Sequence, residues 1–273
     1  MSSAAPVILV TAGSAGLGAA AVRLFAQNGY RVVVNYSNNT DRANKLVEEL
    51  AGLSPLPKDD CDDDDTTTTT TTTTTITNVR KNFVAIRADM GNREEIARLV
   101  QGTIVRFGRL DVLFSNGGWT RFRGMASIDD NCHEEEWDRA FNMNVKSHLW
   151  LMQSAKKHLE ETEGCFITTS SLAGVSVNGS SLAYSVTKAA QLHLAKALAV
   201  MAAPKIRVNS VSPGLLLTDW TDSWTPEQKE AHRQRTKLKR IVTVEDVADQ
   251  VLTYARSRSM TGVNVVMDAG FAL

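Results

Sequence analysis

The 273-residue sequence has few cysteines, no excess of charge of either sign and no long apolar run. Its three cysteines, Cys61, Cys132 and Cys165, are far apart and form no CxxC pair, so neither a disulfide framework nor a cysteine zinc site fits. We therefore expect a reduced, cytoplasmic location. Thirty basic and thirty acidic side chains cancel. This balance argues against nucleic acid or an anionic membrane as a partner, since both attract a basic surplus.

Membrane and secretion signals are also missing from the sequence. No window reaches the roughly 18 apolar residues that a membrane span needs. The apolar run at residues 7–10 is too short for a signal-peptide core and has no basic region before it. What is present, 43% hydrophobic and 22% charged residues, is ordinary for a globular protein that buries a core without disulfides.

One stretch, residues 54–80, has the composition of a low-complexity surface insert. Its first part, residues 54–75, holds two prolines, six aspartates and ten consecutive threonines. Because this composition supplies no packing face, we expect a solvated loop. The aspartates lack the glycine turn and distal glutamate of a calcium loop, and the five histidines show no ligand spacing. No metal site is expected.

Elsewhere, short β-branched runs alternate with helical patterns. The expected strands are residues 7–11, 31–35, 83–88, 110–115, 165–170, 206–211 and 263–267. The expected helices are residues 17–28, 41–51, 93–107, 134–160, 182–202 and 243–256. Almost continuously apolar strands that alternate with helices predict an α/β fold. We expect a single Rossmann-like domain over residues 1–273, a doubly wound parallel sheet of about seven strands with helices on both faces.

A glycine-rich turn joins the first expected strand to the first expected helix. Residues 11–18 contain Gly13, Gly16 and Gly18. Glycines permit a tight turn and the close approach of a phosphate, and the helix N-terminus offers free N–H groups and a partial positive charge. This placement favours a dinucleotide site.

The end of the second strand is expected to meet the adenosine ribose. An acid there would bind the 2′-hydroxyl and favour NAD. The sequence instead has Asn35, Tyr36 and Ser37, with no carboxylate before Asp41. Since neutral donors accept a 2′-phosphate that a carboxylate would repel, NADP(H) is favoured over NAD(H), with Arg42 as a possible phosphate partner. The alternative is that these residues only form a turn.

Tyr184 and Lys188 lie one helical turn apart at the start of an expected helix. A phenol with a pKa near 10 is a poor base at neutral pH, and a nearby ammonium lowers that pKa. Such a pair is common by chance, but its surroundings are informative. Ser171 follows the expected strand 165–170, and other strands end in polar, glycine-containing loops, where open α/β sheets bind ligands.

The order of these elements resembles that of the short-chain dehydrogenase/reductase family over nearly the full chain. The family's TGxxxGxG turn corresponds to residues 11–18, with Ala12 in place of the first glycine. The methyl group of Ala12 fits without strain only if its φ is negative. The NNAG element corresponds to residues 115–118, with Ser115 replacing one asparagine, and PGxxxT and TGxxxxxDxG correspond to residues 213–218 and 261–270.

The resemblance implies an Asn–Ser–Tyr–Lys tetrad at Asn144, Ser171, Tyr184 and Lys188. It implies that Tyr184 gives a proton to the reduced carbonyl, that Ser171 stabilises the same oxygen and that Lys188 holds the nicotinamide ribose. Asn144 would anchor a water that relays protons to the lysine, or would only brace a helix. Ser170 is an alternative to Ser171, which the thirteen-residue spacing from the tyrosine favours.

Further residues are expected to contact the cofactor by the same resemblance. The expected dinucleotide contacts are Gly13, Ser14, Gly16, Leu17, Gly18, Asn35, Tyr36, Ser37, Asp89, Met90, Asn116, Gly117, Tyr184, Lys188, Pro213, Gly214, Leu216 and Thr218. The implied activity is hydride transfer between NADP(H) and a ketone/secondary-alcohol pair.

Substrate signals lie in the loops. Residues 215–236 correspond to the family's variable substrate lid and carry Trp220 and Trp224, while Trp119 and Phe122 follow the fourth main strand. Large aromatic surfaces favour a cyclic or aromatic ketone of secondary metabolism, or else they anchor the lid. A β-ketoacyl thioester is the alternative substrate, and a non-catalytic NADP-binding sensor or scaffold is the alternative of another class. The resemblance also implies a homo-oligomer, a dimer or a homotetramer.

Overall fold

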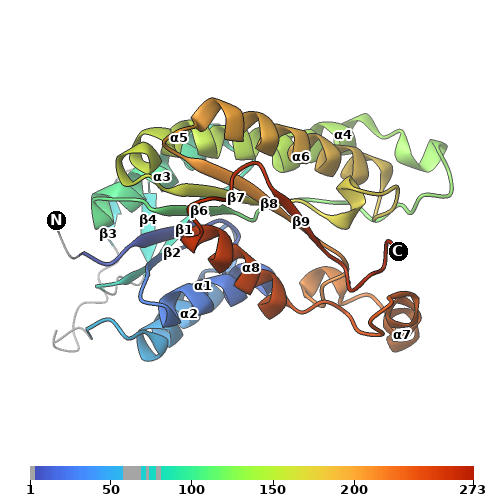
Figure 1. The fold of residues 1–273 in the computed structure, drawn as a ribbon, viewed down its shortest axis with the longest axis horizontal. Coiled ribbons are helices and arrows are strands. Elements are labelled where there is room, and N and C mark those ends of the chain that lie inside the picture. Colours follow the sequence, from blue (N-terminus) through green and yellow to red (C-terminus); the bar gives the residue numbers. More distant parts are fainter. Residues whose placement is uncertain (1–3, 58–68, 72–73, 78–80) are drawn as a thin grey trace.

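The computed structural model describes residues 4–57, 69–71, 74–77 and 81–273. It contains one nine-stranded sheet in the order β3-β4-β5-β2-β1-β6-β7-β8-β9 (Figure 1). The strands are β1 (Val7–Val10), β2 (Arg31–Tyr36), β3 (Thr69–Thr71), β4 (Thr74–Thr77), β5 (Phe83–Arg87), β6 (Val112–Ser115), β7 (Cys165–Thr169), β8 (Arg207–Pro213) and β9 (Asn264–Met267). The seven strands from β5 to β9 in this order pair in parallel.

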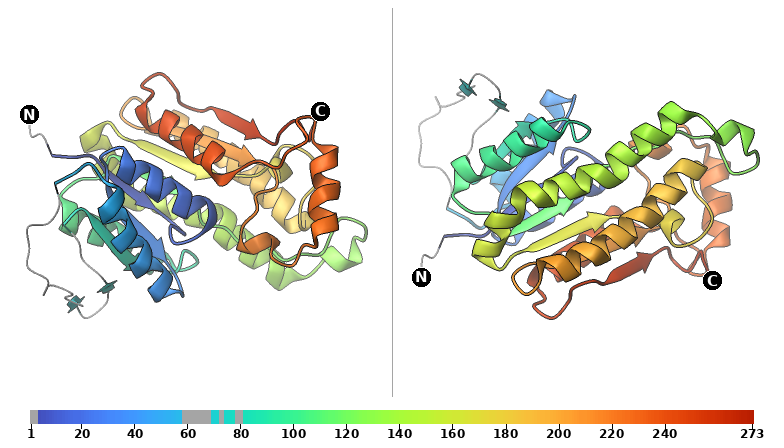
Figure 2. Two further views of the ribbon diagram at one scale, coloured as in Figure 1. Left: turned by 90° about the horizontal axis from the view of Figure 1, so that it is seen from below. Right: turned by 90° about the horizontal axis from the view of Figure 1, so that it is seen from above.

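Helices cover both faces of this sheet (Figure 2). One face carries α3 (Arg93–Phe107), α4 (Glu134–Phe141), α5 (Ser147–Thr162) and α6 (Leu182–Ala202). The other face carries α1 (Gly16–Gln27), α2 (Thr40–Leu53) and α8 (Val244–Arg256). Because both faces are covered, every residue of β1 and β6 is buried, which explains why these strands are apolar without alternation.

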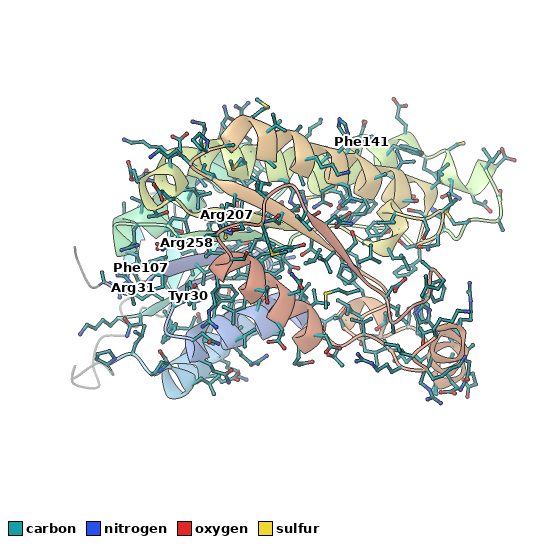
Figure 3. The ribbon with its side chains drawn as sticks, viewed as in Figure 1. Tyr30, Arg31, Phe107, Phe141, Arg207 and Arg258 are labelled. Atoms are coloured by element: carbon teal, nitrogen blue, oxygen red, sulfur yellow. The ribbon has the colours of Figure 1, made fainter. Side chains whose placement is uncertain are left out.

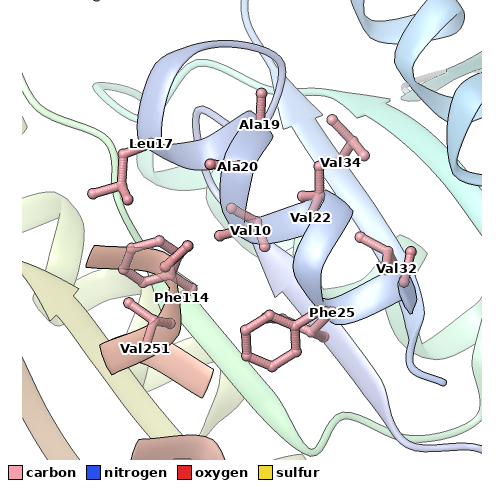
Figure 4. Packing of buried hydrophobic residues seen from close by; sticks show 14 of the residues in the cluster. Val10, Leu17, Ala19, Ala20, Val22, Phe25, Val32, Val34, Phe114 and Val251 are labelled. Atoms are coloured by element: carbon pink, nitrogen blue, oxygen red, sulfur yellow. The ribbon is translucent and has the colours of Figure 1, made fainter. Parts of the chain in front are cut away.

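The core lies in two apolar layers, one on each side of the sheet. In the lower layer, α1 packs its apolar side onto β1 and β2, with Phe25 fully buried beside Val32 (Figure 4). Truncating such a side chain to alanine costs about 3–5 kcal/mol. This packing fixes α1 against the sheet, and it therefore fixes the glycine turn that precedes α1.

The amino ends and the carboxyl ends of the parallel strands lie on opposite sides of the molecule and have different surroundings. At the edge where they begin, the guanidinium of Arg31 lies 5.1 Å from the centre of the Phe107 ring, at one end of the molecule (Figure 3). Arg207 there donates to the carbonyl of Tyr254. At the carboxyl ends of the strands, by contrast, open α/β sheets bind their ligands.

All seven predicted strands are confirmed to within two residues, and the parallel order agrees with the expected fold. The loop predicted for residues 54–75 is wrong where β3 and β4 form an antiparallel pair and β4 pairs with β5. Threonine is β-branched and favours strands, and β5 offers it a free edge. The aspartates of the insert lie outside the described residues, so their prediction is not tested.

The helix predicted over residues 134–160 is divided. α4 and α5 are separated by a π-helical turn at Asn142–Lys146. A further helix, α7 (Pro226–Arg235), begins with a Thr225–Gln228 capping box inside the segment predicted as a lid.

Among the described helices, none combines the length and apolar character needed to cross a bilayer. The described residues also include no cluster of three or more side chains suited to a metal ion.

Candidate active site

A cavity of about 800 Å³ opens at the carboxyl ends of the parallel strands. The loops after β1, β6, β7 and β8 line it, together with the first turns of α6 and the segment that contains α7. Of the predicted site residues, those on its wall are Ser14, Gly16, Leu17, Tyr36, Ser37, Asn116, Ser171, Tyr184, Lys188, Pro213, Gly214, Leu216 and Thr218. The fold therefore brings together most of the positions that the sequence picked out.

The glycine turn forms one end of this cavity by close backbone packing. A Cβ atom on Gly18 would lie 2.2 Å from the carbonyl oxygen of Ala12, and one on Gly13 would lie 2.9 Å from that of Val10. Gly16 has a φ of +49°. These glycines do not all line the cavity, but they shape the turn that does.

The N-terminus of α1 opens into the cavity through Ser14, Ala15 and Gly16. Its N-cap is Ala15, which provides no side-chain cap, and the first turn holds no acidic residue. Helix N-terminal N–H groups that no side chain satisfies bind anions well. This end therefore fits a pyrophosphate.

Ala12 has a φ of +48°, in the left-handed region. The negative φ that its methyl group would need is therefore not adopted, and the residue is strained. Its N–H donates to the side-chain oxygen of Asn35, 3.1 Å away. That hydrogen bond helps to hold the turn in this conformation.

The end of β2 places two of its three predicted residues at the cavity. Tyr36 and Ser37 line the wall, but the side chain of Asn35 is buried and donates to the carbonyls of Ile86 and Ala88. Asn35 therefore braces the strands rather than facing a ribose, which corrects that prediction.

Arg42 also lines the wall, at the start of α2. Its guanidinium lies 2.6 Å from the carboxylate of Asp219, across the cavity mouth. Both side chains are substantially exposed, so this ion pair adds little stability. Both the guanidinium and the carboxylate of this pair belong to the cavity wall.

Asp89 and Met90 do not line the cavity. The carboxylate of Asp89 instead accepts from the N–H of Gly91, 2.8 Å away, and Met90 is buried. The sulfur of Met143 would lie 3.1 Å from a Cβ on Gly91, so this turn is packed against the π-helical turn. The predicted contacts of Asp89 and Met90 with a dinucleotide therefore stay predictions.

Tyr184 and Ser171 meet on the opposite wall. Ser181 caps α6 by accepting from the N–H of Tyr184, which fixes the start of the helix. Ser171 lies near enough to the phenol to lower its pKa, and its hydroxyl accepts from the N–H of Ala173 at 3.1 Å. The neighbouring Ser170 instead donates to the backbone carbonyl of Lys188, 2.9 Å away. The geometry therefore favours Ser171 over Ser170 as the partner of the tyrosine.

Burial raises the pKa of Tyr184 to about 12, because it outweighs the lowering by the hydrogen bond to Ser171. The predicted lowering of this pKa is therefore wrong for the structure. Lys188 lies over the tyrosine ring, with its Nζ atom 5.6 Å from the ring centre. Burial also lowers the pKa of Lys188 to about 7. A phenol with this pKa keeps its proton at neutral pH and is suited to donate it.

Asn144 lies in the π-helical turn and is fully buried. Its amide accepts from the N–H of Trp119 at 2.7 Å and donates to the carbonyl of Trp119 and to the hydroxyl of Thr187. The side chain therefore ties the loop after β6 to α6, which agrees with the bracing alternative. Widened helical turns of this kind are frequent at functional sites.

The loop after β6 is held by the first strand. The hydroxyl of Thr11 accepts from the N–H groups of Asn116 and Gly117, at 2.9 and 3.0 Å. Gly117 does not reach the cavity, but Gly118 does. A Cβ atom on Gly118 would lie 3.5 Å from the Nζ atom of Lys188, in ordinary van der Waals contact with it. Sequence reasoning missed this position.

The substrate side of the cavity is largely apolar. Trp220 packs edge-on against the ring of Tyr184, with ring centres 6.3 Å apart, and Trp224 and Phe122 also line the wall. Trp119 does not line it, because its ring packs under the guanidinium of Arg139. Phe271, from the C-terminal segment, is a wall residue that the sequence did not reveal.

Two further buried residues contact the lysine region and were not predicted. Gln191 accepts from the Nζ atom of Lys188 at 2.9 Å, and His148 lies 3.0 Å from the amide nitrogen of Gln191. Gln191 lies three residues after Lys188, and His148 lies four residues after Asn144. Helical spacing from the tetrad was therefore the available signal for both residues.

Comparison with known proteins agrees with this geometry. A family model described as short chain dehydrogenase matches residues 6–67, and one described as enoyl-(acyl carrier protein) reductase matches residues 61–272. A protein of Streptomyces violaceoruber, described as a ketoacyl reductase of the granaticin polyketide synthase, is 31% identical over 97% of this chain and 96% of its own.

Solved structures are similar over nearly the whole chain. A short chain dehydrogenase of Burkholderia cenocepacia in complex with NADP is 27% identical, with a TM-score of 0.81 and coverage of 98% of both chains. A 7α-hydroxysteroid dehydrogenase in complex with NADH and 7-oxo glycochenodeoxycholic acid is 26% identical, with a TM-score of 0.80 over 98% of this chain and 94% of that one. With its fold, its motifs and these relatives in agreement, the chain belongs to the short-chain dehydrogenase/reductase family of oxidoreductases.

Proposed function

We propose that this protein reduces a ketone to a secondary alcohol with NADPH. The observation that carries the proposal is the meeting of Ser171, Tyr184 and Lys188 on one wall of a cavity whose far end is an uncapped helix N-terminus. One end suits a dinucleotide phosphate and the other suits proton donation to a carbonyl oxygen.

The proposed chemistry divides between cofactor and protein. When bound, the nicotinamide supplies the hydride. Tyr184 gives its proton to the carbonyl oxygen as that oxygen gains negative charge, so one hydride and one proton convert the ketone to the alcohol. Ser171 donates a hydrogen bond to the same oxygen. The ammonium of Lys188 stabilises the phenolate that the proton transfer leaves behind.

NADP is favoured over NAD in this proposal. The wall at the end of β2 offers Tyr36 and Ser37 without a carboxylate, and the Arg42 guanidinium lies at the same end. A 2′-phosphate would compete with Asp219 for this guanidinium. A similar enzyme structure holds NADP and another holds NADH, so the preference depends on this chain's own residues.

The proposed substrate is a cyclic or aromatic ketone of secondary metabolism. Residues 215–236, including α7, would act as its lid, with Trp220 and Trp224 against a flat ring. The relative described as a ketoacyl reductase favours a β-ketoacyl thioester as the second candidate. Turnover of cyclic ketones compared with acetoacetyl thioesters separates the two, and a clear thioester preference would contradict the first.

The decisive variant for the proposal is Tyr184→Phe, which removes only the phenol hydroxyl. We expect NADPH oxidation with a ketone panel to fall at least about 100-fold, the usual loss of a general acid. NADPH binding, followed by its fluorescence, should persist in the variant. Equal rates for variant and wild type would instead support a sensor or scaffold that binds the dinucleotide without catalysis.

We also propose a homo-oligomer, a dimer or a tetramer. The helices α5 and α6 carry large apolar side chains that are exposed in the single chain, namely Leu149, Val186, Val200 and Met201. Burying them against a second copy would stabilise the assembly. Sedimentation velocity tests this proposal, and a monomer mass would contradict it.

A further inference from the structure

A chain of buried hydrogen bonds runs from the cavity wall into the core. The Nζ atom of Lys188 donates to the side-chain oxygen of Gln191 at 2.9 Å, and the amide nitrogen of Gln191 lies 3.0 Å from Nε2 of His148. Nδ1 of His148 lies 2.6 Å from the hydroxyl of Ser115. All four side chains are at most 3% exposed. A buried polar group destabilises the fold when it lacks a hydrogen-bond partner, and here each group has one.

The orientation of the Gln191 amide is fixed by its neighbours. Its oxygen faces the Lys188 ammonium, while its nitrogen lies 3.1 Å from the carbonyl of Thr169 and also contacts the hydroxyl of Thr168. The reversed amide would put its NH₂ group against the ammonium and its oxygen against a carbonyl. Both contacts would be repulsive, so a single orientation is favoured.

This amide orientation also sets the tautomer of His148. Since the Gln191 amide donates to Nε2, the histidine carries its proton on Nδ1 and donates toward Ser115. Burial and the charge of Lys188 lower the pKa of His148 well below its usual value, which keeps the ring neutral. A neutral histidine with its proton on Nδ1 therefore anchors the far side of the glutamine.

The effect on Lys188 is to leave one N–H for the cavity. An ammonium has three N–H donors, and two of them are taken by Gln191 and the carbonyl of Thr169. Lys188 lines the cavity wall, and Gly118, which also lines it, lies beside the Nζ atom. The titratable groups facing the ammonium within the described chain are Tyr184 on α6 and His148 on α5, and both are neutral near pH 7.

We infer that Gln191, anchored by His148 and Ser115, is a positioning residue that holds Lys188 as an ammonium aimed into the cavity. This inference rests on the proposed function, because it gives the lysine its orientation for the reduction. It adds three residues outside the tetrad. Gln191 accepts a hydrogen bond from the Lys188 ammonium, and His148 and Ser115 hold Gln191 in place.

A merely structural role for Gln191 would predict a different behaviour. Loss of core polar contacts lowers stability and total activity but leaves the ionisation of Lys188 where it is. An acceptor for the ammonium, by contrast, favours its charged form, so its removal lowers the lysine pKa and a carboxylate in its place raises it. Opposite shifts from two substitutions at one position therefore identify the positioning role.

The test uses Gln191→Met and Gln191→Glu in the full chain. Lys188 would be titrated by NMR of the protein labelled with [ε-¹³C]lysine, with Lys188→Met identifying its signal. We expect a lower Lys188 pKa in Gln191→Met and a pKa about 1–3 units higher in Gln191→Glu, as for an opposite charge in contact. The alkaline limb of kcat/KM with NADPH and a ketone should move in the same two directions, about tenfold in rate per unit.

Two weaker variants extend the series along the hydrogen-bond chain. His148→Leu removes the anchor of Gln191. Ser115→Ala removes the shorter of two contacts of Nδ1, the other being to the hydroxyl of Thr168 at 3.2 Å. The shift of the alkaline limb should therefore decrease from Gln191→Met to His148→Leu to Ser115→Ala. The control is Thr103→Val, which deletes a fully buried hydroxyl that bonds only within α3. It should lower Tm without moving the pH profile.

The outcomes are distinct for the two proposals. An unchanged Lys188 titration in folded Gln191→Met and Gln191→Glu, judged by their Tm and NADPH binding, would overturn the positioning role. Shifts in the same direction for both variants would also overturn it. The NMR titration needs no substrate, so inactivity of every form, wild type included, would contradict the proposed reduction while the titration still decides the role of Gln191.

Discussion

The two ends of the cavity are built differently. At the glycine turn, backbone atoms make the shape, and a Cβ on Gly18 would lie 2.2 Å from a carbonyl oxygen. At the tyrosine end, buried side chains make the shape, and Lys188 is held by Gln191 and by the Thr169 carbonyl. The first end depends on residues that lack side chains, and the second depends on side chains that satisfy one another.

This difference has consequences for substitution. A site shaped by backbone atoms is disrupted when a substitution adds an atom, whereas a change in the polarity of nearby side chains has little effect on its shape. A site built from buried polar side chains is damaged by removing a single partner, because the group left behind loses its hydrogen bond.

The largest effect is expected from Lys188→Met at the tyrosine end. Loss of the ammonium should lower kcat about 100-fold or more, as for loss of a preorganised charge at a reacting oxygen. Tyr184 loses the charge that stabilises its phenolate. The measurement is steady-state NADPH oxidation at saturating cofactor, and a kcat close to that of the wild type would contradict the role of Lys188.

The same variant makes a prediction about stability. Burial lowers the pKa of Lys188 to about 7 in the folded protein, whereas the unfolded value is near 10.5. Below pH 7 this group therefore lowers the free energy of unfolding by its full amount, and the loss disappears as the pH rises toward 10.5. The Tm of Lys188→Met minus that of the wild type should therefore decrease between pH 7 and pH 10. A difference that grows with pH would contradict the assigned ionisation.

At the glycine turn, Gly18→Ala is expected to have the next largest effect. The added methyl group must displace the backbone of Ala12, which costs about 1–3 kcal/mol of stability and moves the helix N-terminus. We expect NADPH affinity, measured by fluorescence titration, to fall more than tenfold. The matched control is Gly52→Ala near the end of α2, which meets nothing within 4 Å and should be neutral or slightly stabilising.

Arg42→Ala tests whether the cofactor end of the cavity distinguishes NADPH from NADH. A charge-assisted hydrogen bond to a phosphate contributes about 1.5–3 kcal/mol, so kcat/KM for NADPH should fall about tenfold or more. The value for NADH should change little, since NADH has no 2′-phosphate. Equal losses with both cofactors would show that Arg42 does not read the phosphate.

The smallest effect is expected from Ala12→Gly. It relieves the positive φ of Ala12 but adds freedom to the unfolded chain, so the net gain in unfolding free energy should stay within about 1 kcal/mol. Denaturant titration measures this change, and a marked destabilisation would show that the methyl group contributes to packing.

Much of the fold could be predicted from the sequence, because apolar strands and capped helices leave a local pattern. The seven parallel strands followed from their continuous apolar runs, and α3 lies at the predicted residues 93–107. The strands β3 and β4 could not be predicted, because a run of threonines has no packing face and pairs only when β5 offers an edge.

The site was predictable where the chemistry lies in a motif. Ser171, Tyr184 and Lys188 were expected from the resemblance to the family's tetrad, and all three line the cavity wall. The burial of Asn35 could not be predicted. A polar residue at a strand end gives the same sequence pattern whether its side chain faces a ligand or bonds to neighbouring carbonyls. The partnership of His148 with Gln191 joins two helices and has no local signal.

The most direct test of the account follows the hydride itself. Wild type and Tyr184→Phe would be incubated with NADPH deuterated at the transferred position of C4 and a cyclic ketone, and the alcohol analysed by mass spectrometry. We expect one deuterium on the carbinol carbon with the wild type and at least about 100-fold slower labelling with Tyr184→Phe. Labelling at equal rates, or no labelled alcohol from any ketone or ketoacyl thioester, would contradict it.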